Sequence, residues 1–252
     1  MDANEFERLY RRLKSEEDIE ILSKKEKYPK DLLLVILTQK IVRDTKRGYY
    51  SVKNKSPEIM RQWRSGKTML EISKDLEFPP ALTASLLMQH MGVSKKRFRT
   101  HMQEPTTIED PRIKKELNEA MKHELVYSPE ATRIQWERGK EVERKVKEWL
   151  ERMGKRFKTE KQLRDDHAKT PDFLLETPIK HNGRWIKWIE CKASFGDMTE
   201  VRRDYNKQLS HYTRMFGEGI VVYWYGYIEN AKKELNDSII LVDKEFFRRD
   251  MI

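Results

Sequence analysis

The sequence predicts an α/β fold, α+β overall, in which an all-helical amino-terminal region precedes a mixed sheet flanked by helices. Three observations support this prediction. A repeat of helical segments occupies residues 19–91, runs rich in aromatic and β-branched residues are concentrated after residue 170, and segments with helical periodicity alternate with those runs. Strands that alternate with helices are typical of a sheet covered by helices.

The amino-terminal region contains an internal repeat. Each copy reads as a short helix, a break at Tyr28-Pro29 or Phe78-Pro79, and then an apolar helix. Residues 19–41 and 69–91 align at an offset of 50, which pairs Ser23 with Ser73, Lys24 with Lys74, Pro29 with Pro79, Leu32 with Leu82, Leu37 with Leu87, and Gln39 with Gln89. We therefore expect residues 1–103 to form a tandem helix-turn-helix region that binds nucleic acid.

The second copy resembles a helix-turn-helix, but its second helix is poorly suited to reading bases. Residues 81–88 carry no basic or amide side chain that could meet a base edge. Basic residues lie beyond this helix instead, at Lys95, Lys96, Arg97 and Arg99. Such a cluster is expected to contact phosphates without specifying a sequence. The alternative is a solvated surface of two packed helical bundles.

A polar, proline-bearing stretch at residues 104–111 is predicted to be a linker, so the second domain should comprise residues 112–252. Its predicted elements, in order, are a helix over 112–126, a second helix that Ser128-Pro129 begins and that runs to Gly154, one strand, and then the two strands of a hairpin. A helix over 202–215, strands over 220–227 and 238–242, and a terminal helix follow.

The hairpin is predicted from its turn and from the residues on either side of it. Asn182-Gly183 favours a tight turn between strands that begin at Asp172 and end near Glu190. Side chains alternate along a strand, so Ile186, Trp188, Glu190 and Lys192 should share one face. Pairing the strands would bring Asp172 level with Glu190.

Two converging carboxylates repel each other unless a cation lies between them, and Mg²⁺ or Mn²⁺ suits oxygen ligands. Lys192 could orient or deprotonate an attacking water, or offset charge on a phosphoryl group. These residues predict a metal-dependent phosphodiesterase. Because charged residues make up 37% of the chain, a solvated pair without chemistry is the alternative.

Pro171-Asp172 and Glu190-Cys191-Lys192 resemble the signature of PD-(D/E)XK nucleases, whose fold is restriction-endonuclease-like. Lys169 to Phe173, together with Trp188 to Asp197, is more narrowly similar to the TPD family. The resemblance continues through Gln208 to Tyr212 and Gly219 to Gly226, and it covers most of the chain. It implies that Asp172, Glu190 and the backbone carbonyl of Cys191 hold the metal.

Two further motifs come from the same resemblance. Gly139 to Glu143 resembles the Gly-x-x-x-Glu of archaeal junction-resolving nucleases, which implies that Glu143 is a third acidic residue, with Glu141 as its rival and an ordinary amphipathic helix as the alternative. Gln208-x-x-x-Tyr212 resembles a motif of RecB-type nucleases and implies that Gln208 supports catalysis and that Tyr212 contacts the substrate.

Composition limits the class of partner. Lys and Arg number 52 against 42 Asp and Glu, a net charge of +10 that favours a polyanion such as nucleic acid. One cysteine excludes an internal disulfide, and the lack of Cys-x-x-Cys or His-x-x-x-His argues against structural zinc. No apolar run could span a bilayer, so we expect an intracellular protein, cytoplasmic in a prokaryote or nuclear and cytoplasmic in a eukaryote.

The sequence thus predicts a Mg²⁺-dependent nuclease that acts on nucleic acid, with structured DNA as the expected substrate. It does not decide whether the substrate is DNA or RNA, or whether the strand is cut internally or from an end. The oligomeric state is also left open. The alternative function is a nuclease-fold module that binds nucleic acid or docks a protein partner with little or no cleavage.

Overall fold

The computed structural model describes residues 1–164 and 169–249. The chain divides into two compact units, one formed by residues 1–37 with 137–252 and the other by residues 38–136. We call them the sheet unit and the helical unit. This division differs from the predicted boundaries, because the first 37 residues belong with the sheet and the predicted start of the second domain at residue 112 belongs with the helices.

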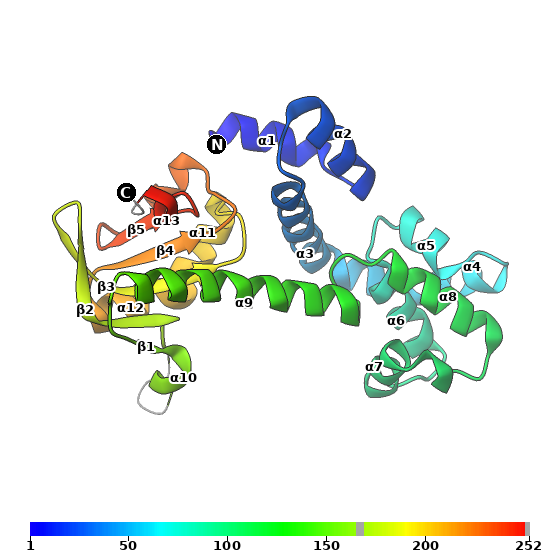
Figure 1. Ribbon diagram of the computed structural model, residues 1–252. Helices are drawn as coiled ribbons and strands as arrows, with labels where there is room; N and C mark the ends of the chain where they lie inside the picture. The colour runs from blue at the N-terminus through cyan, green and yellow to red at the C-terminus, as the bar shows by residue number, and fades with distance from the viewer. Residues whose placement is uncertain (165–168, 250–252) are drawn as a thin grey trace. The chain divides into compact units, whose positions relative to one another are not determined.

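The sheet unit is built on a five-stranded mixed sheet in the order β1-β2-β3-β4-β5, as Figure 1 shows. The first three strands pair antiparallel and the last three pair parallel. The strands are β1 (Phe157–Thr159), β2 (Phe173–His181), β3 (Arg184–Lys192), β4 (Gly219–Tyr223) and β5 (Ile239–Val242). The predicted mixed sheet with flanking helices is confirmed.

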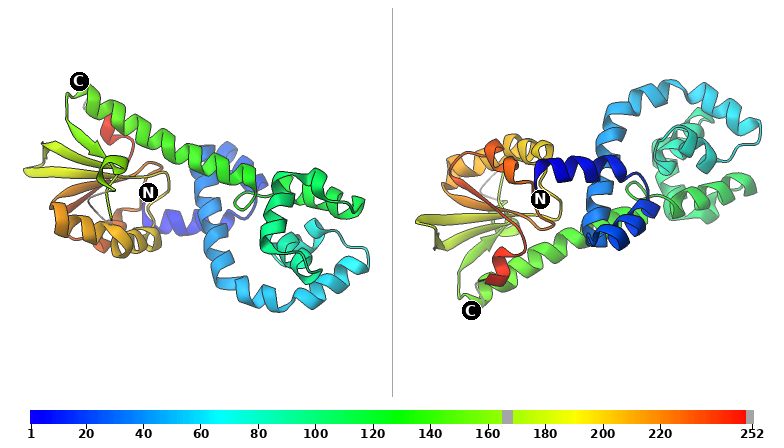
Figure 2. Two further views of the ribbon diagram at one scale, coloured as in Figure 1. Left: turned by 90° about the horizontal axis from the view of Figure 1, so that it is seen from below. Right: turned by 90° about the horizontal axis from the view of Figure 1, so that it is seen from above.

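Helices cover both faces of this sheet. In Figure 2 the carboxyl-terminal part of α9 (Pro129–Arg152) lies on one face, and the helical segment that follows β3 lies on the other. That segment consists of α11 (Met198–Asp204), a π-helical turn (Tyr205–Leu209) and α12 (Ser210–Phe216). The remaining helices of this unit are α1 (Ala3–Arg12), α2 (Glu16–Glu26), α10 (Glu160–Leu163), a 3-10 turn (Glu229–Glu234) and α13 (Phe246–Arg249).

The main core of the sheet unit lies between α9 and the sheet. Val146, Trp149 and Leu150 follow helical spacing and pack on Phe173 and Ile189 of the central strands. Helix α9 starts as predicted, because the Ser128 hydroxyl accepts a hydrogen bond from the Ala131 N–H at 3.1 Å and Pro129 occupies the first turn. One face of the site-bearing hairpin is thereby fixed to a rigid helix.

The hairpin turn forms as predicted, with both Asn182 and Gly183 at positive φ (49° and 78°). One detail of the prediction is wrong. The pairing of β2 with β3 shifts between Leu174 and Ile179, and Ile186 belongs to the core cluster of Ile189, which does not include Trp188. A bulge of this kind interrupts the regular alternation of side chains along a hairpin.

The helical unit is a bundle around a core of its own. Its core residues include Ile59, Ile72, Leu87, Phe98 and Leu117. Its helices are α4 (Ser56–Arg64), α5 (Met69–Asp75), α6 (Pro80–His90), α7 (Lys95–Gln103) and α8 (Pro111–Lys122), together with part of α3 (Lys30–Asn54), the first turns of α9 and a 3-10 turn (Pro105–Thr107). The stretch predicted to be a linker therefore includes a helical turn, and its Ile108 is 8% exposed within this core.

The repeat found in the sequence is visible in the backbone. Helices α2 and α3 in the first copy, and α5 and α6 in the second, are each joined by a short break. Lys27 and Glu77, which correspond at the same offset of 50, both adopt positive φ, at 60° and 48°. Two equivalent left-handed residues indicate that the copies share one turn geometry, although α3 continues for 25 residues and α6 for 11.

Candidate active site

The hairpin register brings the two predicted carboxylates together. Phe173 pairs with Ile189, so Asp172 stands level with Glu190 at the end of the hairpin away from its turn. The Asp172 Oδ2 atom accepts a hydrogen bond from the Cys191 N–H at 2.7 Å. Asp172 thus fixes the backbone at Cys191, the residue next to Glu190.

Glu190 is the most constrained residue of the site. It is 6% exposed, and its Oε1 atom accepts hydrogen bonds from Lys192 Nζ at 2.6 Å and from Gln208 Nε2 at 2.8 Å. Burial nevertheless raises the pKa of Glu190, with the adjacent Lys192 charge opposing the rise. The predicted Glu190, Lys192 and Gln208 therefore form one contacting group.

Asp172 is less well compensated. Burial raises its pKa well above the ordinary value, and the neighbouring Glu190 charge raises it further, while the Cys191 N–H opposes both effects. The reciprocal effect is seen at Lys192, where carboxylate charges raise the pKa although burial lowers it. Two carboxylates and one ammonium group in so small a space are one positive charge short of neutrality.

The helical segment after β3 supplies the support on this face of the sheet. Gln208 lies in the π-helical turn, and Tyr212 one turn later donates its hydroxyl hydrogen to the Thr170 carbonyl at 2.7 Å. The Tyr212 ring packs on Trp188 with centroids 5.4 Å apart, and burial raises the pKa of its phenol. Tyr212 is 3% exposed, so it positions the Thr170-Pro171 segment before Asp172 and offers little surface to a substrate.

Gly219 makes the packing of Trp188 feasible. A Cβ atom at position 219 would lie 2.0 Å from the indole ring, far inside contact distance. Only glycine lets the neighbouring strand pass so close to the ring. The Trp188–Tyr212 contact, and with it the position of the Thr170-Pro171-Asp172 segment, depends on that glycine.

Helix α9 brings Glu143 to the same region. Glu143 Oε2 pairs with Lys140 Nζ at 2.7 Å, and its charge contributes to the raised pKa of Asp172. Its rival Glu141 pairs with Arg144 and Lys145, which lower the pKa of Glu141 to about 2. Glu143 is therefore the acidic residue of this helix whose charge reaches the site.

Sequence reasoning missed Asp204. This carboxylate is 4% exposed, accepts a hydrogen bond from the Tyr223 hydroxyl at 2.9 Å, and pairs with Arg203 at 2.9 Å. Its charge raises the pKa of both Glu190 and Lys192. Asp204, Gln208 and Tyr212 follow one another at intervals of four residues, which is the spacing of one helical face. This spacing is the feature of the sequence that could have identified Asp204.

The donor set fits a hard cation that keeps most of its water. Within residues 1–164 and 169–249, no three His, Cys, Asp or Glu side chains gather as a ready-made metal site. Mg²⁺ is commonly held by one or two carboxylates, and substrate phosphate and water complete its shell. Asp172, Glu190 and the Cys191 carbonyl meet that requirement, and the surplus of negative charge beside them favours a cation.

The four cations that the sequence predicts to contact nucleic acid lie on α7 of the helical unit. Lys95, Lys96, Arg97 and Arg99 are all exposed, while Phe98 and His101 on the same helix are buried. No acidic residue occupies the first turn of α7, where the helix dipole would favour one. Three cations in this first turn, Lys95, Lys96 and Arg97, are unfavourable for the helix itself, which indicates a surface suited to an anion.

The second helix of the repeat does not present a reading surface. Along α6, residues Ala81, Ala84, Leu87 and Met88 are buried in the core of the bundle. The N–H of Ala81, at the start of the helix, donates to the buried Glu124 carboxylate at 2.8 Å. The core of the bundle and Glu124 therefore occupy one side and the start of α6.

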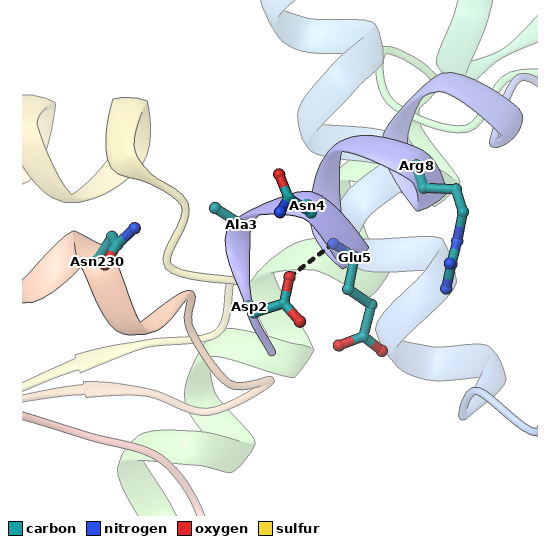
Figure 3. Close-up of a pocket in the computed structure, with 6 residues that line it drawn as sticks. All are labelled: Asp2, Ala3, Asn4, Glu5, Arg8 and Asn230. Carbon is teal, nitrogen blue, oxygen red and sulfur yellow. Dashed lines mark hydrogen bonds between the residues drawn. The ribbon is translucent and has the colours of Figure 1, made fainter.

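Another cavity of the sheet unit lies apart from these residues. It has a volume of about 520 Å³ and is lined by Asp2, Ala3, Asn4, Glu5, Arg8 and Asn230 (Figure 3). Asp2 already accepts a hydrogen bond from the Glu5 N–H at 2.9 Å as the cap of α1. Separately, none of the helices in the described ranges combines the length and the apolar character needed to cross a bilayer.

Comparison with known proteins agrees with the resemblance. A family described as "Protein of unknown function TPD sequence-motif" matches residues 109–245. CDAN1-interacting nuclease 1 of Danio rerio is 30% identical over 234 residues, which cover 85% of this chain and 77% of that protein. The Mus musculus protein of the same name is 28% identical over 239 residues, which cover 87% and 84%. No solved structure matches.

The family match spans more than half of the chain and includes the hairpin, the π-helical turn and the Thr170-Pro171-Asp172 sequence. The relatives extend the similarity into the helical unit. This chain therefore belongs to the TPD sequence-motif family.

Proposed function

We propose that this protein is a divalent-metal-dependent nuclease that hydrolyses phosphodiester bonds, with structured DNA as the substrate. The observation that carries the proposal is the convergence of Asp172 and Glu190, two carboxylates whose pKa values are raised, beside Lys192. A structural role would not require two incompletely compensated carboxylates at one point. The relatives are named as nucleases, which supports the same reaction class.

In this proposal Asp172, Glu190 and the Cys191 carbonyl hold Mg²⁺ or Mn²⁺. When bound, such an ion withdraws charge from the phosphate and makes water more acidic. Glu143 completes the acidic cluster from α9. Asp172 already accepts a hydrogen bond from the Cys191 N–H. This contact fixes the backbone at Cys191, and with it the direction of the Cys191 carbonyl.

Lys192 has two roles that follow from its place. Its ammonium group lies 2.6 Å from Glu190, so it partly neutralises the site while the substrate is away. When a phosphate arrives, the same group can turn to orient the attacking water or to stabilise the added negative charge. Gln208 holds Glu190 in position during that change. The cations of α7 contact the nucleic-acid backbone without reading its sequence.

The test is cleavage by the purified full chain with Mg²⁺ or Mn²⁺. Single-stranded, duplex, flap and four-way-junction DNAs and matched RNAs form the substrate panel. Asp172→Asn, Glu190→Gln and Lys192→Met should each lower the rate at least about 100-fold. Glu141→Gln is the matched control, because Glu141 pairs with its own helix, and it should cut like the parent. The proposal fails if the panel stays uncut or if the three variants retain the parental rate.

A second candidate function is docking of a protein partner. The relatives are named as CDAN1-interacting, which favours a partner for this chain as well. If this chain only docks a partner, binding of that partner should not depend on Asp172 or Glu190. Pull-down of a CDAN1-type protein by the parent and by Asp172→Asn separates the two functions. Equal capture by both proteins, with no cleavage by either, supports docking alone.

A further inference from the structure

One side of α7 lines a pocket, together with the 3-10 turn that follows the helix. The pocket has a volume of about 340 Å³ and is lined by Ser94, Lys96, Arg97, Thr100, His101 and Thr107. Of the four exposed cations of α7, Lys96 and Arg97 line it, and Lys95 and Arg99 do not. Two cations, three hydroxyl groups and one imidazole thus line one pocket between a side of α7 and the 3-10 turn that follows it.

His101 gives the pocket its chemical character. The side chain is 5% exposed, and its Nδ1 atom lies 2.7 Å from the Thr107 hydroxyl oxygen. That hydroxyl donates its only hydrogen to the Glu104 carbonyl at 2.7 Å. The Nδ1 atom must therefore carry the hydrogen in its contact with Thr107, which leaves Nε2 as an acceptor in the neutral ring.

The hydrogen bond of His101 within the described residues uses Nδ1, so Nε2 has no hydrogen-bond partner there, and His101 lines the pocket. Burial lowers the pKa of His101, and the charge of Arg97 lowers it further, so the ring is neutral near pH 7. A ligand for this pocket should carry negative charge for Lys96 and Arg97 and a proton to share with Nε2. Few anionic groups offer both.

A phosphate monoester offers both, whereas a phosphodiester does not. Its second ionisation lies near pH 6, so close to neutral pH the monoester can take up one proton from solvent on binding and donate it, as a P–O–H group, to Nε2. A diester carries no proton at that pH and could only accept hydrogen bonds. In a nucleic acid the monoester occurs at a phosphorylated strand end.

We propose that the α7 pocket binds the terminal phosphate of a nucleic-acid strand, with Lys96 and Arg97 as its cations and His101 Nε2 as the partner of its proton. This proposal rests on the proposed nuclease function for its choice of ligand source. It narrows the substrate class to nucleic acids with a phosphorylated end. Lys95 and Arg99, outside the pocket, contribute general backbone attraction.

Binding in EDTA tests the pocket separately from cleavage. Fluorescence anisotropy would compare one short labelled DNA strand with a 5′-phosphate, a 3′-phosphate or neither, using the full chain. The parent should bind one phosphorylated end about tenfold more tightly than the unphosphorylated strand. Lys96→Gln with Arg97→Gln should remove that preference. Lys95→Gln with Arg99→Gln removes equal charge from the same helix and should weaken all strands while keeping the preference.

A second measurement does not depend on variants. The ¹⁵N signal of His101 Nε2 should shift on addition of a phosphorylated strand and stay unchanged with the unphosphorylated strand. Equal affinity for phosphorylated and unphosphorylated ends would overturn the proposal, as would equal loss of preference in both double variants. Tighter binding of a phosphoserine peptide than of the phosphorylated strand would overturn the proposal that the bound phosphate belongs to a nucleic acid. None of these outcomes bears on whether Asp172 and Glu190 support cleavage.

Discussion

Two carboxylates of the helical unit and two of the sheet unit differ in how well neighbouring hydrogen-bond donors compensate their charge. In the helical unit, Glu124 accepts three backbone N–H groups, from Ala81, Val126 and Tyr127. Its companion Glu116 accepts from Trp63, Met69 and Arg112. In the sheet unit, Asp172 and Glu190 instead face each other, and the pKa of each is raised.

This contrast separates buried charge that stabilises from buried charge that is available for chemistry. A carboxylate with several donors ties loops and helix starts together. A carboxylate without enough donors destabilises the folded chain until something else supplies positive charge. Burial alone therefore does not identify the site, whereas the balance of partners does.

Removal of a well-partnered carboxylate should give the largest change in stability. Glu124→Ala leaves three N–H groups without their acceptor and should lower the free energy of unfolding by about 3 kcal/mol. Chemical denaturation measured by circular dichroism gives this value. Glu109→Ala, at an exposed position before α8, should change it by less than about 0.5 kcal/mol. Equal effects of the two substitutions would contradict the structural role of Glu124.

Removal of a poorly partnered carboxylate should have the opposite sign. A raised pKa in the folded chain means that stability is full below the ordinary Asp value near 4 and is lost as pH rises through the folded-state value. Asp172→Asn keeps an oxygen for the Cys191 N–H and removes the charge. In EDTA at pH 7.5 it should raise the free energy of unfolding by roughly 1.5 kcal/mol.

The pH dependence is the control for this prediction. At pH 3, where the carboxyl is protonated in both the folded and unfolded chain, the parent and Asp172→Asn should unfold at closely similar denaturant concentrations. If Asp172→Asn is instead less stable than the parent at pH 7.5, the Asp172 carboxylate has enough hydrogen-bond donors and stabilises the fold, which would contradict this prediction.

The smallest expected effect distinguishes the two acidic residues of α9. Glu143→Gln removes a charge that acts on Asp172 and should slow cleavage about fivefold, or roughly 1 kcal/mol in activation free energy. Glu141→Gln, two positions away on the same helix, should leave the rate unchanged because Glu141 pairs with Arg144 and Lys145. A slower Glu141→Gln enzyme with a normal Glu143→Gln enzyme would reverse the assignment.

The parts of the fold that the sequence predicts correctly depend on local rules. Asn182-Gly183 encodes the hairpin turn by itself, and the hairpin in turn brings Asp172 level with Glu190. Ser128-Pro129 similarly encodes the start of α9. The repeat was visible because both copies need the same break, and Lys27 and Glu77 take the same backbone conformation.

The parts that sequence reasoning missed depend on contacts between distant residues. Glu124 reaches Ala81 across 43 positions, so nothing near α6 indicates that its start is occupied. Asp204 gains its role through Tyr223, and the shift of register between Leu174 and Ile179 is set by the packing of the sheet. Assignment of the first 37 residues to the sheet unit likewise requires the folded chain.

The most direct test of the central claim is Mn²⁺ binding measured by electron paramagnetic resonance in the absence of nucleic acid. If Asp172 and Glu190 are held for a cation, the parent should bind Mn²⁺, Glu141→Gln should bind it equally, and Asp172→Asn should lose most of the affinity. Absence of binding by the parent at millimolar Mn²⁺, or equal binding by Asp172→Asn, would contradict the assignment of these carboxylates to a metal site.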